Sequence, residues 1–102
     1  MALQYVVQNG PENITVRLEG VLELAAHPVF RSLLEDLDRQ ERAASVTFDL
    51  GGVSSIDPAG LGLLLIARRR LGGRRLALRN PCPDVNHVLS LTGFSALVPL
   101  VA

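Results

Sequence analysis

The stretch SSIDPAGLGLLLIARRR, residues 54–70, places the start of a helix at one defined point in the chain. Asp57 is a good N-cap residue, because its carboxylate can accept a hydrogen bond from an N–H group of the first turn. Pro58 suits the first helical position, where its missing N–H has no helical partner to lose, and it favours the extended backbone that an N-cap needs at Asp57. We therefore predict a helix over residues 58–71 that ends at Gly72 and Gly73.

Apolar side chains surround most of the first two turns of this helix. They fall on two faces, with Leu61, Leu64 and Leu65 on one and Leu63, Ile66 and Ala67 on the other. One apolar face is enough to cover a sheet, so the pattern indicates either deep burial or a protein-binding surface. Gly60 and Gly62 would let the first turn approach a neighbouring backbone closely.

The periodicity of the remaining chain predicts an α/β fold. Strand patterns occupy residues 3–8, 14–22, 45–50, 74–79 and 96–101, and helical patterns occupy residues 28–42, 58–71 and 83–92. We expect a loop between residue 50 and the helix at residue 58. The order β-β-α-β-α-β-α-β implies a hairpin followed by parallel crossovers, and hence a mixed sheet of four to five strands with packed helices.

The totals limit the classes of protein to which the chain can belong. Its 102 residues suffice for a single domain, residues 1–102, and ten basic and ten acidic residues leave no net charge. A neutral chain gives no reason to expect nucleic acid or an anionic membrane as a partner. No signal-peptide pattern is present, and the longest apolar run, residues 61–67, is too short for membrane insertion. Cys82 is the single cysteine, so no internal disulfide can form, and we expect a cytoplasmic location.

Residue types that carry catalysis or bind metals are few and scattered. His27 and His87 are far apart in the sequence and have no cysteine or carboxylate at metal-ligand spacing. Cys82 stands between two prolines and has no partner histidine placed by a motif. Asp49 and Asp57 flank the predicted loop and could approach each other, but a strand end and an N-cap also explain them. We expect a binding protein rather than an enzyme, with no catalytic residue, metal or cofactor.

Five arginines cluster around the end of the predicted 58–71 helix: Arg68, Arg69, Arg70, Arg74 and Arg75. Cations in the last turn of a helix complement its dipole, which would be a purely structural role. The alternative is a site for an acidic partner or a phosphate-bearing ligand, and the sequence leaves both interpretations open.

Four motifs together resemble the STAS domain of bacterial anti-sigma factor antagonists. They are a hydrophobic strand ending in Asp49 and Leu50, the Asp-x-x-Gly-Leu-Gly pattern of residues 57–62, the glycines at 72 and 73, and the Val-x-x-x-Leu-x-x-x-Gly pattern of residues 85–93. The resemblance covers residues 46–100 strongly and the first 45 residues more loosely, through ITVRLEGVLEL. It implies a STAS fold and binding to an anti-sigma factor, a Ser/Thr kinase-like protein, which frees a sigma factor for transcription.

In that family the hydroxyl residue directly after the aspartate is phosphorylated by the anti-sigma factor, and the added charge breaks the contact. Here Pro58 occupies the acceptor position and Ala59 the next one, so the resemblance implies a docking surface without its phosphorylation site. Ser54 and Ser55, just upstream, are candidates for a replacement site, although ordinary turn hydrogen bonds also explain them. The partner-binding residues that the resemblance implies are Asp57, Pro58, Ala59, Gly60, Leu61, Gly62 and Leu63, with apolar contact from Leu61 and Leu63.

Two other functions stay open on the sequence. The chain could be a scaffold or sensor STAS module of a larger signalling or transport complex, or it could bind a small anionic ligand at the helix N-terminus. Members of the family usually continue into a C-terminal helix, whereas this chain stops at Ala102. We therefore expect exposed apolar surface near its end and self-association as a homodimer.

Overall fold

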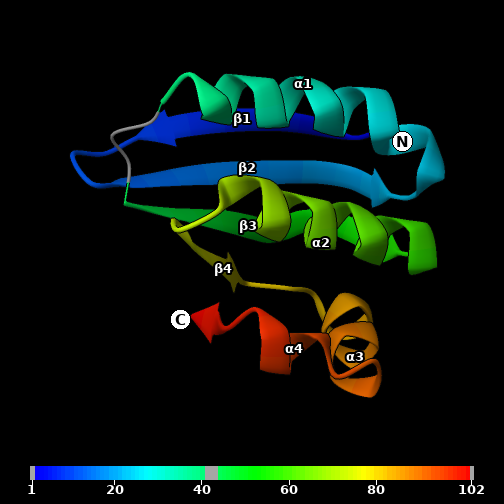
Figure 1. Ribbon diagram of the computed structural model, residues 1–102. Helices are drawn as coiled ribbons and strands as arrows, with labels where there is room; N and C mark the ends of the chain where they lie inside the picture. Colours follow the sequence, from blue (N-terminus) through cyan, green and yellow to red (C-terminus); the bar gives the residue numbers. More distant parts are fainter. Residues whose placement is uncertain (1, 41–43, 102) are drawn as a thin grey trace.

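The computed structural model, which describes residues 2–40 and 44–101, is built around a five-stranded sheet with the strand order β1-β2-β3-β4-β5 (Figure 1). The strands are β1 (Gln4–Asn9), β2 (Asn13–Leu22), β3 (Ser45–Ile56), β4 (Arg75–Arg79) and β5 (Leu100–Val101). β1 and β2 form an antiparallel hairpin, whereas the pairs β2–β3, β3–β4 and β4–β5 are parallel. The predicted mixed α/β fold is confirmed.

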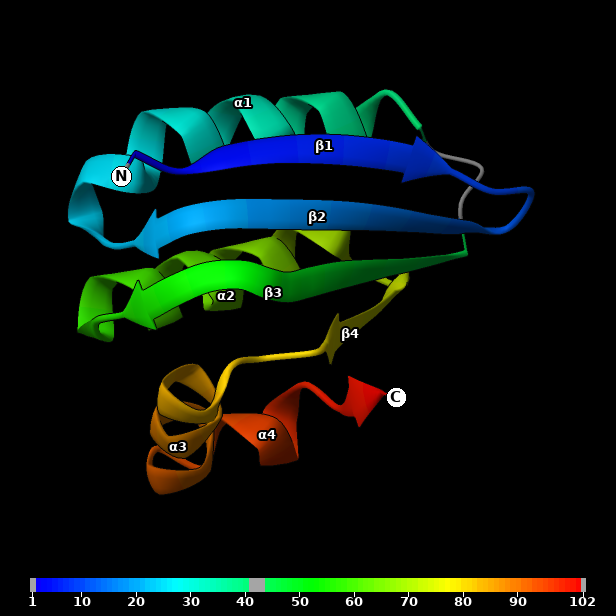
Figure 2. The same ribbon diagram turned by 180° about the vertical axis from the view of Figure 1, so that it is seen from behind.

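The two longest helices lie together on one face of the sheet. These are α1 (His27–Asp38) and α2 (Pro58–Leu71), each of which connects two parallel strands (Figure 1). The short helices α3 (Pro83–Leu91) and α4 (Phe94–Leu97) follow β4, and a 3-10 turn, η1 (Leu24–Ala26), leads from β2 into α1. Seen from behind, β1, β2 and β3 have no described helix over their other face (Figure 2).

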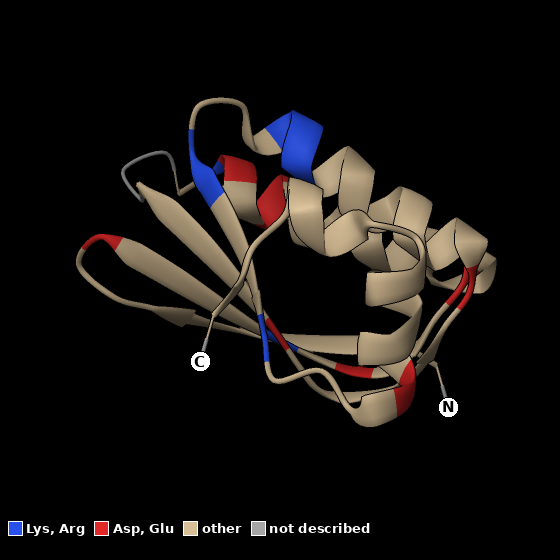
Figure 3. Cartoon of the chain, turned by 90° about the horizontal axis from the view of Figure 1, so that it is seen from below, with Lys and Arg blue, Asp and Glu red and all other residues tan. Residues whose placement is uncertain are grey.

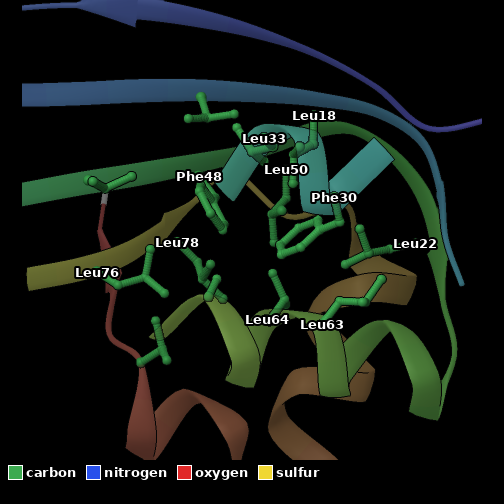
Figure 4. Packing of buried hydrophobic residues seen from close by; sticks show 14 of the residues in the cluster. Leu18, Leu22, Phe30, Leu33, Phe48, Leu50, Leu63, Leu64, Leu76 and Leu78 are labelled. Atoms are coloured by element: carbon green, nitrogen blue, oxygen red, sulfur yellow. The ribbon is translucent and has the colours of Figure 1, made fainter. Parts of the chain in front are cut away.

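The core fills the space between the sheet and these helices (Figure 4). Alternate strand residues point into it, including Ile14, Val16 and Leu18 of β2 and Val46, Phe48 and Leu50 of β3. The helices add Phe30, Leu33, Leu34 and Leu37 from α1 and Leu63, Leu64, Ala67 and Leu71 from α2. The rings of Phe30 and Phe48 meet edge to face, with centroids 5.9 Å apart. Each large side chain buried here stabilises the fold by about 1.5–3 kcal/mol, so these contacts hold both helices on the sheet.

β3 is longer than the sequence predicts. The expected strand over residues 45–50 continues to Ile56, because it stays paired with β2 as far as Leu22. Two irregularities in the register allow this pairing, and at one of them Gly20 has a φ of +114°, a conformation that favours glycine. The expected loop before α2 is therefore strand, and α2 begins almost directly at the end of β3.

The end of α1 also differs from the prediction. The helix ends at Asp38 rather than at residue 42, and residues 41–43 lie outside the described part of the chain. The guanidinium of Arg74 donates to the carbonyls of Leu37 and Gln40, at 3.2 and 3.1 Å. The Leu37 carbonyl also accepts the Gln40 N–H at 3.0 Å, so Arg74 adds a second donor there and a side-chain donor to the Gln40 carbonyl, which stabilises the turn.

The predicted strand over residues 96–101 is mostly wrong. A helical turn, α4, precedes a strand of only two residues, β5. Gly93 has a φ of +71° and redirects the chain after α3, so that the buried ring of Phe94 opens a new turn. The Val98 N–H closes that turn by donating to the carbonyl of Phe94 at 3.0 Å.

Tyr5 joins β1 to α1 through a short hydrogen bond. Its hydroxyl donates to the carboxylate of Asp36 at 2.6 Å, and Arg39 donates to the same carboxylate at 3.0 Å. The hydrogen bond to Asp36, together with desolvation, raises the pKa of Tyr5 to about 12. The neutral phenol is therefore the form that the folded state favours.

Replacing Tyr5 with phenylalanine should keep the ring and remove this hydrogen bond. We expect Tyr5→Phe to lower the free energy of unfolding by about 1 kcal/mol at neutral pH, as measured by urea denaturation. Because the folded-state pKa lies above the unfolded value of about 10, the contribution is complete below pH 10 and is lost as the pH rises toward 12. The chain has one tyrosine and no lysine, so few other groups titrate in this range. Equal losses of stability between pH 10 and 12 in both proteins would contradict the assignment.

Candidate functional site

The predicted start of α2 is confirmed by its hydrogen bonds. Asp57 has an extended backbone and its carboxylate accepts a 2.7 Å hydrogen bond from the Gly60 N–H, which makes it the N-cap. Pro58 is the first residue of the helix. The Asp57 N–H in turn donates to the carbonyl of Leu22, at the end of β2, at 3.2 Å. The cap thus fixes where α2 begins and joins that point to the neighbouring strand.

Gly60 is required by the same contact with β2. A Cβ atom at this position would lie 2.0 Å from the Leu22 carbonyl oxygen and 3.0 Å from the side chain of Ile56. A Cβ atom at Gly62 would meet nothing within 4 Å. The predicted close approach to a neighbouring backbone is therefore correct for Gly60 and wrong for Gly62.

An uncharged surface surrounds the start of α2. Pro58 is exposed and Ala59, Leu61 and Gly62 are half-buried, while Leu65 and Ile66, one to two turns further on, are 41% and 46% exposed. Leu24 of η1, the turn that lies against α2, is 71% exposed. We call these residues the helix-start surface: Leu24, Pro58, Ala59, Leu61, Gly62, Leu65 and Ile66. Exposed apolar side chains gathered in one place are typical of a protein-binding site.

The other predicted docking residues lie beneath this surface. Leu63 is only 4% exposed and belongs to the core, and Gly60 is buried against Leu22. The Asp57 carboxylate is engaged in capping the helix. Sequence reasoning did not select Leu24, because η1 carries no motif, although an apolar residue two positions after the end of a strand was a usable signal.

Ser54 and Ser55 are strand residues rather than loop residues. Both are exposed near the end of β3, and the Ser54 hydroxyl donates to the carbonyl of Gly20 at 3.4 Å. The predicted turn hydrogen bonds are therefore wrong, since the hydroxyl bridges two paired strands instead.

Asp49 lies well inside β3, not at its end as predicted. It accepts hydrogen bonds from the Gly51 N–H at 2.9 Å and from the guanidinium of Arg79 at 3.1 Å. Burial acts to raise the pKa of Asp49, but these two partners outweigh it and hold the pKa below its ordinary value. Asp49 is thus a paired structural carboxylate, and seven further strand residues separate it from Asp57.

The remaining candidates for chemistry stay apart. His27 and His87 are exposed on α1 and α3, and Cys82 is half-buried with its Sγ 3.5 Å from the carbonyl of Val53. Within residues 2–40 and 44–101, no group of three or more histidine, cysteine or acidic side chains is arranged to hold a metal ion. None of the helices in the same part of the chain has the length and apolar character needed to cross a membrane.

The basic cluster lies at the opposite end of α2 from the helix-start surface. Figure 3 shows basic residues gathered where the last turn of α2 meets the start of β4. Arg70 donates twice to Asp38 of α1, at 3.2 and 2.7 Å, and Arg74 binds the end of α1 as described above. Two of the five arginines therefore have structural roles, and Arg68, Arg69 and Arg75 are exposed.

The family model described as "Mlab, STAS domain" matches residues 6–100, and the chain belongs to this STAS family. The resemblance seen in the sequence motifs is confirmed. No curated protein sequence matches the chain.

Solved structures of anti-sigma factor antagonists share the fold. One from Mycobacterium paratuberculosis gives a TM-score of 0.85 at 18% identity, covering 97% of this chain and 85% of that chain. The antagonist SpoIIAA in its unphosphorylated form gives 0.73 at 22% identity, covering 97% and 89%. The Bacillus cell fate determinant SpoIIAA in its phosphorylated form gives 0.69 at 22% identity, covering 97% and 92%. Likeness at these identities shows a common fold.

The contact between α2 and β2 predicts opposite effects of the same substitution at two glycines. Gly60→Ala should lower the free energy of unfolding by more than about 2 kcal/mol, because the added methyl group overlaps the Leu22 carbonyl. Gly62→Ala should raise it by about 0.5–1 kcal/mol, because alanine favours the helix and the space is open. Urea denaturation of both variants tests this expectation, and a Gly60→Ala variant as stable as Gly62→Ala would contradict it.

Proposed function

We propose that this protein is an anti-sigma factor antagonist that binds a kinase-like anti-sigma factor through the helix-start surface. We further propose that binding is not switched off by phosphorylation at the usual position. The observation that carries the proposal is the exposed, uncharged surface at the start of α2, where Pro58 is the first helical residue. The sequence resemblance implies that this position holds the acceptor hydroxyl in the family. The solved antagonists of the same fold support the assignment of the partner class. Such a role would place the protein in the cytoplasm.

The composition of the surface favours a protein partner over a small anion. The Asp57 carboxylate already accepts from the first turn of α2, so its negative charge stands where an anionic ligand would bind. The apolar side chains of Leu24, Leu65 and Ile66 would gain by losing contact with water on docking. A protein surface with complementary apolar groups satisfies both conditions.

Because position 58 has no hydroxyl, we expect that the docking surface cannot be inactivated by phosphorylation there. A phosphate at the first helical position would add nearly two negative charges to a surface without charged members. Neither Pro58 nor Ala59 can accept one, so the surface keeps the uncharged state that docking requires. Regulation would then not act through a phosphate on Pro58 or Ala59.

A charge placed on the helix start should reproduce the missing switch. Pro58→Glu should fold, because an acidic residue is favoured near a helix N-terminus, yet its charge must be desolvated on docking. We expect Pro58→Glu to weaken binding by about tenfold or more, and Pro58→Ser to bind as the wild type does with at most about 1 kcal/mol lost in stability. The measurement is calorimetric titration with the kinase-like protein that a pull-down from native lysate identifies.

Pro83→Glu is the matched control. Pro83 is also an exposed proline in the first position of a helix, α3, but it lies outside the helix-start surface. The Pro83→Glu variant should bind the kinase-like protein with unchanged affinity. Tight binding by a folded Pro58→Glu variant would show that the helix start is not the docking site. The pull-down could instead capture a partner that has no kinase fold and no longer binds the Pro58→Glu variant. That result would refute the anti-sigma assignment and would favour the role of a module in a larger complex.

A further inference from the structure

A groove of about 780 Å³ lies at the end of α2 opposite to the helix-start surface. It runs between the last turn of α2, the first part of β4 and the segment that ends in β5. α2 has 14 residues, so at 1.5 Å per residue Pro58 lies about 20 Å from the last residue of the helix, while Leu65 and Ile66 of the helix-start surface lie within one turn of Arg68 and Arg69. A ligand in the groove would therefore leave Pro58 and the first turn of α2 free.

Four arginines line this groove, and they differ in what they already bind. Arg74 is fixed by the carbonyls of Leu37 and Gln40. Arg68, Arg69 and Arg75 are exposed, and no carboxylate in the described part of the chain is within ion-pair distance of them. The groove therefore carries a concentration of positive charge on a chain whose net charge is zero. An anionic group is the complementary partner.

The remaining walls of the groove come from the start of β3, where Ser45, Val46 and Thr47 lie, from β4 and from the segment that ends in β5. Leu97, Pro99 and Val101 line one side, and the side chains of Leu97 and Val101 are about half exposed. β5 pairs only with Leu78 and Arg79, so the first part of β4 has no strand beside it on this side among the described residues. An uncovered strand edge offers N–H and C=O groups to a segment in extended conformation.

We propose that this groove binds an extended acidic peptide segment of a partner protein. Acidic side chains would pair with Arg68, Arg69 and Arg75, and alternate apolar side chains would contact Leu97 and Val101. Main-chain groups of the segment would hydrogen-bond to the uncovered edge of β4. A free phosphate group would use the arginines alone and leave the apolar wall and the strand edge without a partner, which is why the geometry points to a peptide.

The test uses a fluorescein-labelled peptide in which glutamate and valine alternate, with a glutamine–valine peptide as the uncharged control. Fluorescence anisotropy should show saturable binding of the glutamate peptide only, weakening as salt is added. The double variant Arg68→Gln/Arg75→Gln should bind about tenfold more weakly. The control double variant Arg31→Gln/Arg39→Gln removes the same charge from exposed positions in α1 and at its C-cap, outside the groove, and should bind as the wild type does. Pro58→Glu should also leave peptide binding unchanged.

Three results would overturn the proposal. The first is equal or absent binding of the two peptides by the wild-type protein. The second is the same loss of affinity in the groove variant and in the α1 control, which would indicate attraction by overall charge. The third is complete displacement of the peptide by an equal concentration of inorganic pyrophosphate, which would identify a phosphate site. Circular dichroism melting of each variant ensures that only folded protein is compared.

Discussion

The rest of the structure depends on the contact between the carbonyl of Leu22, at the end of β2, and the first turn of α2. The carbonyl accepts the Asp57 N–H at 3.2 Å, and it lies so close to Gly60 that no side chain fits between them. The last residue of β2 and the first turn of α2 are therefore in direct backbone contact, although they are far apart in the sequence. Because the Asp57 side chain caps the same turn, the start of α2 is fixed in position by one strand and in register by its own cap. Pro58 is presented at the surface by this arrangement and does not contribute a backbone donor to it.

The two ends of α2 consequently have different chemistry. The first turn exposes uncharged residues and uses its one carboxylate internally, whereas the last turn carries Arg68, Arg69 and Arg70. Both arrangements agree with the helix dipole, which favours a negative charge at the cap and positive charges at the end. The chain thus presents two surfaces of distinct character on one rigid helix, one suited to an apolar protein face and the other to acidic groups. Pro58 lies about 20 Å from the last residue of the helix, while Leu65 and Ile66 lie within one turn of Arg68 and Arg69.

The sequence predicted the elements with strong local signals and missed those set by pairing at a distance. The bounds of α2 and the capping role of Asp57 follow from neighbouring residues, and the structure confirms both. The length of β3 could not be read locally, since Gly51, Gly52, Ser54 and Ser55 have loop-like composition and become strand only because β2 lies beside them. The apolar residues around α2 were consistent with deep burial or with a protein-binding surface. The structure shows that Leu63 is buried in the core, whereas Leu65 and Ile66 are exposed. Arg70 and Arg74 have structural roles because α1 lies close to them, and residue spacing along the sequence does not reveal this proximity.

The most direct test of the central claim is an amide NMR titration of the isotope-labelled protein with the kinase-like anti-sigma factor. If the helix-start surface is the docking site, the amide signals of Leu24 and of residues 59–62, 65 and 66 should shift or broaden on binding. Signals from β4 and from the last turn of α2 should stay in place, because they are at the other end of the helix. Changes confined to β4 and the end of α2, with residues 59–62 unaffected, would contradict the account.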